Sequence, residues 1–263
     1  MPLALLALTI SAFAIGTTEY VIVGLVPTIA EQLAISLPSA GLLVSIYALG
    51  VAVGAPVLTA LTGRFPRKQL LVALMVLFTA GNILAWQAPD YTTLVIARLL
   101  TGLAHGVFFS IGSTIATSLV PKEKAASAIA IMFGGLTVAL VTGVPLGTFI
   151  GQHFGWRETF LAVSLLGVIA LVASLLLVPS SIPGRASASL SDQVKVLTHP
   201  RLLLIYAVTA LGYGGVFTAF TFLAPMMQEL AGFSPGAVSW ILLGYGISVA
   251  IGNIWGGKLA DKH

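Results

Sequence analysis

The stretch GTTEYVIVGLVP, Gly16–Pro27, decides the fold because the chain repeats its pattern further on. A shift of 198 residues aligns the region from Gly16 to Arg64 with a second region, without a gap. Such a repeat predicts two related bundles of six helices, the second starting near residue 202. The matched pairs are Gly16 and Gly214, Leu25 and Leu223, Pro27 and Pro225, Glu31 and Glu229, Ser36 and Ser234, Tyr47 and Tyr245, Val51 and Val249, Gly54 and Gly252, Leu61 and Leu259, and the basic pair Arg64 and Lys262.

The composition excludes a water-soluble domain. Hydrophobic residues make up 58% of the 263 residues and charged residues only 8%, whereas a soluble domain carries about 25% charged residues. We therefore predict an all-α integral membrane protein that crosses the bilayer many times. The net charge of +4 falls in short clusters between apolar runs, so we expect no nucleic-acid partner. The chain has no cysteine, which excludes disulfides and thiolate metal sites, and we expect neither a metal nor a cofactor.

Eight apolar segments reach the roughly 20 residues that a helix needs to span a bilayer. They predict an N-terminal six-helix bundle in residues 1–178, a Ser-rich cytoplasmic linker in residues 179–201, and two further helices in residues 202–263. Because these two helices match the first two of the bundle, we expect a truncated C-terminal bundle from which four helices are missing. The segments are Leu3–Ile29, Ser39–Leu61, Gln69–Gln87, Thr93–Leu119, Ala126–Gly151, Thr159–Val178, Leu202–Gln228 and Gly236–Gly257.

The basic residues between the segments predict the orientation. Ten of the twelve fall on one side of the predicted membrane, one, Arg157, falls on the other, and one, Arg98, lies inside the fourth segment. Loops rich in Lys and Arg stay in the cytoplasm, which places the N-terminus there. The ten are Arg64, Arg67, Lys68, Lys122, Lys124, Arg185, Lys195, Arg201, Lys258 and Lys262.

Five short motifs lie in a fixed order along these segments. TALTGRFPRK, Thr59–Lys68, follows the second segment, and GGKLADK, Gly256–Lys262, follows the eighth. The fourth segment contains IARLLTGLAHG, Ile96–Gly106, and the fifth contains GLTVALVTGVPLG, Gly135–Gly147; GWRETF, Gly155–Phe160, precedes the sixth. In this order they resemble the motifs of the major facilitator superfamily, over essentially the whole chain. The chain looks closest to the drug:proton antiporter branch with twelve helices, of the bacterial sugar-efflux or arabinose-efflux permease type.

The resemblance implies roles for the charged residues of these motifs. The arginine of the fourth segment, Arg98, is associated in the family with proton coupling, and the motif of the fifth segment with antiport. The family's cytoplasmic aspartate, here Asp261, helps to latch helix ends during gating together with basic residues such as Arg64 and Arg67. Gly63 stands where this aspartate is usual in the N-terminal half, which puts the latch there in doubt.

Small residues predict where helices approach closely. Gly143, Gly147 and Gly151 recur every four residues and therefore share one helix face, beside the kink site Pro145. Gly252 and Gly256 give the eighth segment a similar face. In the family the fifth and eighth helices meet between the two halves, so these faces are candidates for packing and gating there; ordinary packing elsewhere in the bundle is the alternative.

Glu19 is a lone carboxylate inside an apolar run, and intramembrane acids usually mark ion or substrate pathways. Helical rise places Glu19 and Arg98 at a similar depth, so the two can pair across a cavity. Burial opposes ionisation of a carboxyl and a nearby arginine favours it, which suits a group that binds and releases a proton. The alternatives are a structural, protonated Glu19 and an Arg98 that snorkels to the interface. Scaffold positions recur in the repeat, but the partner of Glu19 is Phe217.

Other polar residues are weaker candidates. His105 lies two turns after Arg98 on the same face, and we interpret it as a packing residue, with a proton relay as the alternative. We expect Trp156 in the interfacial aromatic belt, and Arg157 and Glu158 as a solvated pair. The groups that either line a pathway or join helices are Tyr47, Tyr245, Asn82, Tyr213 and Asn253.

The sequence thus predicts a transporter of the bacterial inner membrane rather than an enzyme, since no HExxH or GxSxG motif occurs. The expected mechanism is proton-coupled efflux of sugars or drug-like small solutes by alternating access, in a protein that is monomeric in the lipid bilayer. Glu19 is the predicted coupling carboxylate and Arg98 the group that tunes its proton affinity. The alternatives are proton-coupled or facilitated uptake on the same fold, and a fragment that does not transport.

Overall fold

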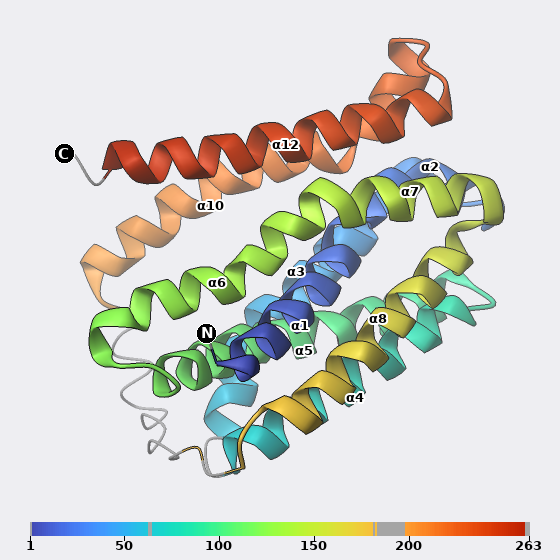
Figure 1. Cartoon of the computed structure of the whole chain (residues 1–263). Coiled ribbons are helices and arrows are strands. Elements are labelled where there is room, and N and C mark those ends of the chain that lie inside the picture. Colours follow the sequence, from blue (N-terminus) through green and yellow to red (C-terminus); the bar gives the residue numbers. More distant parts are fainter. Residues whose placement is uncertain (1, 63–64, 181, 183–197, 261–263) are drawn as a thin grey trace.

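The computed structural model describes residues 2–62, 65–180, 182 and 198–260, apart from the side chains of residues 59, 60 and 253–260. In this part of the chain long helices run side by side, and no strand occurs (Figure 1). Eight helices are long and apolar enough to cross a membrane, as predicted. Arg64 and Asp261, and the contacts of Asn253 and Gly256, lie outside the described residues.

The helices follow the predicted segments closely. Several spans are divided into consecutive pieces, as described below. The pieces are α1 Leu3–Tyr20, α2 Ile22–Gln32, α3 Leu37–Thr62, α4 Arg67–Trp86, α5 Tyr91–Ser118, the short 3₁₀ turn η1 Lys122–Lys124, α6 Ala125–Val138, the π turn η2 Ala139–Gly143, α7 Val144–Phe154, α8 Trp156–Leu177, α10 Pro200–Thr221, α11 Leu223–Pro225, the π turn η3 Met226–Leu230, and α12 Pro235–Ala260.

The first and seventh spans, predicted as single helices, are each interrupted shortly before the proline of the repeat. Val21 separates α1 from α2, which contains Pro27, and Phe222 separates α10 from α11, which ends at Pro225. Proline has no N–H to donate to the carbonyl four residues earlier, so it weakens a helix on its N-terminal side. The repeat therefore preserves the proline, while the interruption lies six residues before it in the first span and three before it in the seventh.

The fifth span carries a π turn at the predicted kink site. Pro145 cannot donate to the carbonyl of Val141, and the Val144 N–H bonds to the Ala139 carbonyl, five residues back. The wider turn, η2, joins α6 to α7.

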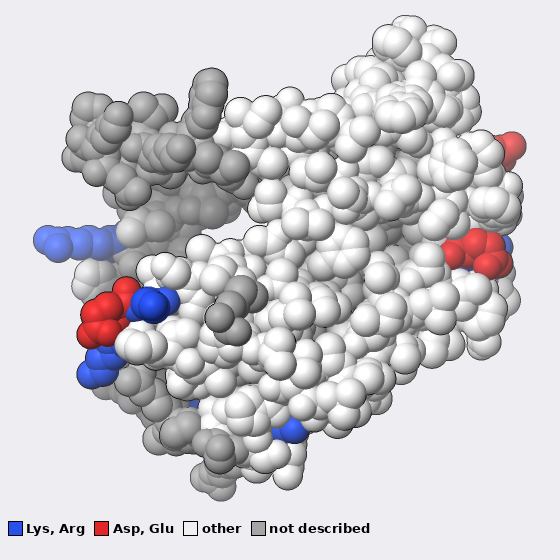
Figure 2. Space-filling model, in the orientation of Figure 1, with Lys and Arg blue, Asp and Glu red and all other residues white. Residues whose placement is uncertain are grey.

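Charged groups lie at the two ends of the bundle. On the face shown in Figure 2, Lys, Arg, Asp and Glu gather at these ends, and the broad surface between them carries almost no charge. We call the end with Arg67, Lys68, Lys122, Lys124 and Arg201 the basic end. At the opposite end Asp90 caps α5 by accepting a hydrogen bond from the Thr93 N–H at 2.8 Å, which holds the pKa of the Asp90 carboxyl below its usual range.

Two apolar clusters fill the interior, one toward each end. The cluster at the basic end is built around Leu8, Leu71 and Phe108, and the other around Leu25 and Phe160. The side chains that lie between the clusters are polar, and we call them the polar layer. The layer consists of Thr18 and Glu19 of α1, Tyr47 of α3, Asn82 of α4, and Arg98, Thr101 and His105 of α5.

Glycines bring the backbones of α3 and α5 close together and so position this layer. Gly50 and Gly54 of α3 lie against the backbone of Leu99 and Leu103, and Gly102 and Gly106 of α5 lie against the backbone of Tyr47 and Val51. A side chain at any of the four would meet backbone atoms. Because α3 and α5 cannot separate or slide without losing this fit, Tyr47 is held opposite Arg98 and His105.

Candidate functional site

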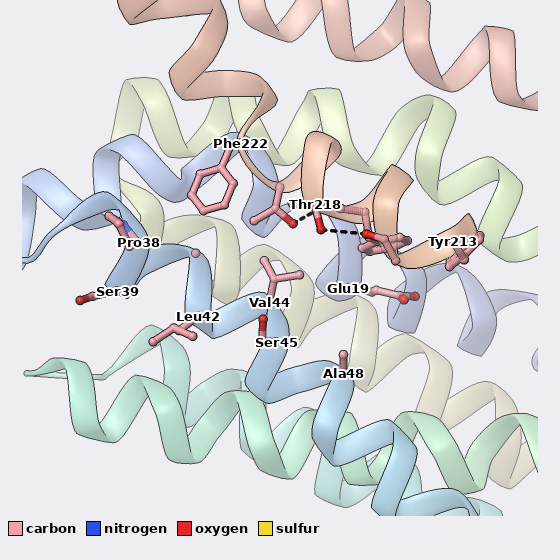
Figure 3. Close-up of a pocket in the computed structure, with 14 residues that line it drawn as sticks. Glu19, Pro38, Ser39, Leu42, Val44, Ser45, Ala48, Tyr213, Thr218 and Phe222 are labelled. Carbon is pink, nitrogen blue, oxygen red and sulfur yellow. Dashed lines mark hydrogen bonds between the residues drawn. The ribbon is translucent and has the colours of Figure 1, made fainter. Parts of the chain in front are cut away.

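A cavity of about 680 Å³ lies between α1, α3 and α10, where the second bundle meets the first. Glu19 is the one charged side chain among the described residues that line it. Figure 3 shows Glu19 and Tyr213 toward one end of the cavity and Pro38 and Phe222 toward the other. The remaining wall is apolar or carries hydroxyls, including Ser45 of α3 and Thr218 of α10, whose hydroxyl already donates to the Gly214 carbonyl.

Glu19 also faces other members of the polar layer, in particular His105. Its side chain is only 18% exposed, and its Oε2 lies 3.8 Å from Nδ1 of His105, whose side chain is 12% exposed. Glu19 is therefore accessible from the cavity on one side and contacts a second titratable group on the other.

His105 is held by Tyr47 and by aromatic packing. The Tyr47 hydroxyl lies 2.8 Å from His105 Nδ1, the same nitrogen that Glu19 approaches. The ring of His105 also packs against Phe109, with 4.9 Å between centroids. His105 is thus both a packing residue and a neighbour of the predicted coupling carboxylate, and the two interpretations made from sequence are compatible.

Arg98 lies beside Thr18, next to Glu19, but its partners differ from the predicted one. Its Nη1 donates to the carbonyl of Thr18 at 2.8 Å, and its guanidinium stacks over the Tyr47 ring, 4.2 Å from the centroid. No ion pair joins Arg98 to Glu19 in the described chain; the carboxylate turns to His105 instead. The guanidinium lies over the Tyr47 ring, and its Nη1 bonds to the backbone of Thr18, the residue beside Glu19.

The burial of Arg98 excludes snorkelling. The residue is 1% exposed, so its charge stays inside the bundle. Burying an ion costs several kcal/mol. A cation–π contact of about 2 kcal/mol and a charged hydrogen bond of about 1.5–3 kcal/mol offset much of that cost. Nη2 is buried without a hydrogen-bond partner among the described residues, so the guanidinium retains one donor for a further acceptor.

Asn82 joins helices rather than lining the cavity. It is fully buried, its Oδ1 accepts a hydrogen bond from the Thr18 hydroxyl at 2.6 Å, and its Nδ2 donates to the Phe78 carbonyl. The same residue, Thr18, thus holds Asn82 through its hydroxyl and Arg98 through its carbonyl. This bridge fixes the segment of α1 that carries Glu19.

A second cavity, of about 410 Å³, lies on the other side of α10, against α1, α6 and α12. Tyr213 and Phe217 line both cavities, so this face of α10 separates them. Tyr245, a predicted pathway residue, lines the second cavity and stacks on Phe220 with 4.6 Å between ring centroids. The described residues that line the second cavity carry no formal charge.

The glycine stripe of the fifth span packs inside the first bundle, not between the halves. Gly143 lies against Thr17, and Gly147 against Val21 and Thr159. The prediction that this stripe faces the eighth span is therefore wrong. Pro145 faces the other way and lines a cavity shared with α12. The rotation of α7 about its own axis decides this, and sequence spacing alone does not fix that rotation.

The fifth and eighth spans do meet, as the family resemblance implied, but through other residues. Gly246 of α12 lies against the backbone of Leu140 and Val141 in η2. Gly252 has no atom within 4 Å of the position that a side chain would take, so it makes no such contact among the described residues. Of the basic residues assigned to gating, Arg67 is described and is buried at the first position of α4.

Two predictions at the opposite end are wrong. Trp156 is fully buried and packs against Phe160, so it is a core residue and not an interfacial one. Arg157 stacks over Trp156 and donates from Nε and Nη2 to the Ala88 carbonyl, at 3.1 and 2.7 Å. It therefore joins α8 to the end of α4 and does not pair with Glu158.

The contacts between α3 and α5 that position the site were not predicted from the sequence. GxxxG spacings, Gly50–Gly54 and Gly102–Gly106, lie in the second and fourth segments and were the available signal for the α3–α5 contact. The contact of Tyr47 with Arg98 and His105 had no signal beyond the recurrence of the tyrosine in the repeat. No cluster of three or more potential metal ligands occurs among the described residues.

Comparison with known proteins identifies the relatives of this arrangement. The family model described as Major Facilitator Superfamily matches residues 8–263. The chain is 55% identical over 260 residues to an uncharacterized MFS-type transporter, YtbD, of Bacillus subtilis strain 168, covering 99% of this chain and 66% of that protein. It is 46% identical over 258 residues to the inner membrane transport protein YdhP of Escherichia coli K12, covering 98% of this chain and 66% of that protein.

A solved structure shares the fold. The crystal structure of a bacterial homologue of the human lysosomal transporter Spinster, inward-facing and unoccupied, matches with a TM-score of 0.73 at 20% identity. The match covers 98% of this chain and 62% of that one. The chain thus spans about two thirds of the length of the relatives it matches.

Proposed function

Because the chain belongs to the Major Facilitator Superfamily, we propose that it functions as a secondary active transporter that exports sugars or drug-like small solutes in exchange for protons. The two halves would rock about the cavities between them, which open alternately to either side. The protein would be a monomer in the bacterial inner membrane with its N-terminus in the cytoplasm. The name of the relative YdhP and the basic end of the bundle support this placement.

The observation that carries the proposal is the position of Glu19. It is the one charged side chain among the described residues of the cavity between the halves, and its carboxylate also lies 3.8 Å from His105. A proton taken up by Glu19 changes the charge of the cavity wall from negative to neutral. The state of the carboxylate therefore bears directly on which solute occupies the cavity and on which conformation follows.

Arg98 supplies the opposing charge. When Glu19 loses its proton, the buried Nη2 of Arg98, which has no hydrogen-bond partner among the described residues, offers a donor for the carboxylate. When Glu19 regains the proton, the stack on Tyr47 and the bond to the Thr18 carbonyl hold Arg98 in place. The resemblance of the fifth span to the antiporter motif supports export rather than uptake.

The test is a transport assay on the Glu19→Gln variant of the full-length protein in proteoliposomes. L-arabinose serves as the sugar probe and ethidium as the drug-like probe, each driven by an imposed pH gradient. The wild type should accumulate at least one probe against its concentration gradient. The variant should lose this accumulation, falling to the level of protein-free liposomes, because glutamine cannot carry the exchanged proton.

Glu31→Gln is the matched control, since Glu31 lies in the same span but is exposed at its end, away from the cavity. This variant should accumulate the probe as the wild type does. If Glu19→Gln keeps accumulation that depends on the pH gradient, Glu19 is not the coupling residue. Vesicles of both orientations establish whether protons and solute move in opposite directions.

A further inference from the structure

One nitrogen atom, Nδ1 of His105, faces two competing partners. The Tyr47 hydroxyl lies 2.8 Å from it, and the Glu19 Oε2 lies 3.8 Å from it. An imidazole nitrogen has one in-plane position, occupied by either a lone pair or an N–H. Full hydrogen bonds from Nδ1 to both partners therefore cannot form together, and the shorter distance belongs to Tyr47.

Tyr47 is fixed at both ends. Its ring lies under the Arg98 guanidinium, 4.2 Å from centroid to Cζ, and its side chain is buried, at 2% exposure for the residue. The close α3–α5 contact, with Gly102 against the backbone of Tyr47, prevents the residue from moving away. The hydroxyl hydrogen alone is free to rotate, so Tyr47 can change its hydrogen bond without moving its ring.

We propose that Tyr47 is a positioning residue for proton coupling: its hydroxyl donates to Nδ1 of His105 and so withholds that nitrogen from Glu19. This inference rests on the proposed function, in which Glu19 carries the exchanged proton. With Nδ1 engaged by Tyr47, Glu19 must exchange its proton with the cavity. Without Tyr47, Nδ1 becomes an acceptor for the carboxyl proton of Glu19.

The proton balance follows directly. In the proposed arrangement, the neutral His105 ring carries its hydrogen on Nε2 and accepts the Tyr47 O–H at Nδ1. If that O–H turns away, the Glu19 carboxyl either donates its O–H to Nδ1 or transfers the proton. In the transfer the O–H bond breaks and an N–H bond forms, leaving a carboxylate and an imidazolium. Both outcomes stabilise the singly protonated state of the Glu19–His105 pair relative to its deprotonated state.

The other groups around the pair come from every helix that packs on it. Arg98 lies on the same helix as His105, and Tyr20 of α1 and Tyr213 of α10 are the further titratable groups that interact with this cluster. Asn82 of α4 is engaged with Thr18, and Phe133 of α6 reaches the cluster through Phe109. Among these groups of the described chain, Tyr47 is the one whose hydroxyl lies within hydrogen-bond distance of His105 Nδ1.

The test is a substrate-free difference titration of the purified full-length protein. Protons bound are measured against pH for each protein and for the same protein carrying Glu19→Gln, and the difference gives the midpoint of the Glu19–His105 pair. Tyr47→Phe keeps the ring under Arg98 and removes the hydroxyl. We expect the midpoint to move to higher pH by about 0.5–1 unit, the shift that one neutral hydrogen bond produces.

The sign follows from the state that each hydrogen bond favours. The Tyr47 hydroxyl stabilises unprotonated His105, so removing it leaves the deprotonated pair without this bond. The singly protonated pair regains a bond between Glu19 and Nδ1. Proton binding is therefore tighter in Tyr47→Phe, and a midpoint that stays in place or moves to lower pH overturns the proposal.

Two controls separate this role from general loosening of the bundle. Tyr91→Phe removes another hydroxyl bond between the same helices, since Tyr91 of α5 donates to the Ser39 carbonyl of α3 at 2.7 Å. It should leave the midpoint unmoved, and an equal shift there overturns the proposal. In a His105→Phe background, Tyr47→Phe should cause no shift, and a shift that persists shows that Tyr47 does not act through His105.

The result is independent of the transport assay. If Glu19→Gln abolishes accumulation of the probe while Tyr47→Phe leaves the midpoint unmoved, the role of Tyr47 fails and the proposed function stands. If Glu19→Gln retains coupled accumulation, the proposed function fails whatever the titration of Tyr47→Phe shows.

Discussion

The first and seventh spans share one sequence pattern, and both are interrupted, but they differ in chemistry. Both are interrupted just before the shared proline, Pro27 or Pro225. The first span carries Glu19 at the level where the seventh carries Phe217, and both side chains line the same cavity. The second and eighth spans differ in the same way. Tyr47 contacts a cation and an imidazole, whereas its counterpart Tyr245 stacks on a phenyl ring.

The difference shows how a repeated scaffold carries a function that is not repeated. Proline recurs in both copies, but the matched glycines differ in packing. Gly16 and Gly54 lie against neighbouring helices, whereas no atom among the described residues lies within 4 Å of the side-chain position at Gly214 or Gly252. Glu19, the proposed proton-binding group, has no acidic counterpart at the matching position, Phe217, and two carboxylates facing one cavity would repel each other when ionised.

The largest expected effect comes from moving the carboxylate to the other copy. Combining Glu19→Gln with Phe217→Glu places an acid at the matching position of α10 and should leave accumulation of the probe at the protein-free level. The described ring contacts of Phe217 are Tyr20, Tyr213 and Phe220, so the new acid gains neither the histidine nor the arginine. Phe217→Gln in the same background is the control. Restored coupling in the Phe217→Glu protein would mean that the two copies are equivalent.

A smaller effect, on the free energy of unfolding, is expected from replacing the matched glycines Gly54 and Gly252 by valine. Gly54→Val should lower the free energy of unfolding of the 263-residue chain by about 1–3 kcal/mol, because the new side chain meets the backbone of Leu103. Gly252→Val should change it by less than about 0.5 kcal/mol, since open space surrounds that position among the described residues. Denaturant unfolding in mixed micelles, followed by tryptophan fluorescence, measures both. Equal losses would show that the two glycines serve the same packing.

The smallest effect concerns the hydroxyl next to Glu19. Thr18→Val keeps the shape of the side chain but leaves the Asn82 Oδ1 buried without its donor, and should cost about 1 kcal/mol of unfolding free energy. The reverse exchange at the matched position, Val216→Thr, should stay within about 0.5 kcal/mol, because Val216 is 55% exposed. Thermal unfolding of both variants checks this. A stable Thr18→Val protein would remove Thr18 from the network that holds the polar layer.

Much of the fold was predictable because it depends on local composition. Eight apolar segments of sufficient length predict eight spans wherever they lie, since every backbone group inside a bilayer must bond within its own helix. Pro145 marked the π turn of the fifth span for an equally local reason, the missing N–H, whereas the interruptions of the first and seventh spans were not predicted. Glu19 and Arg98 stood out in sequence because charge is rare in such segments, and helical rise alone gave their common depth.

What was not predictable depends on how each helix is rotated about its axis. Spacing showed that Gly143 and Gly147 share a face, but the rotation of α7 turned that face to α1 and α2 instead of α12. Burial of Trp156 likewise depends on which side of α8 meets the core. These choices follow from the sum of many small contacts over the whole bundle, which no single segment contains.

The sequence by itself determined a polytopic membrane protein with a repeated scaffold and one acid inside it, because hydropathy, proline and charge act within a single helix. Only the tertiary structure decided what that acid touches. Close glycine contacts between α3 and α5 set Tyr47 against Arg98 and His105. The Arg98 guanidinium lies over the Tyr47 ring, and Glu19 faces His105 and the cavity. The chemistry of Glu19 is therefore a property of three helices meeting at one level, and not of the stretch GTTEYVIVGLVP in which it lies.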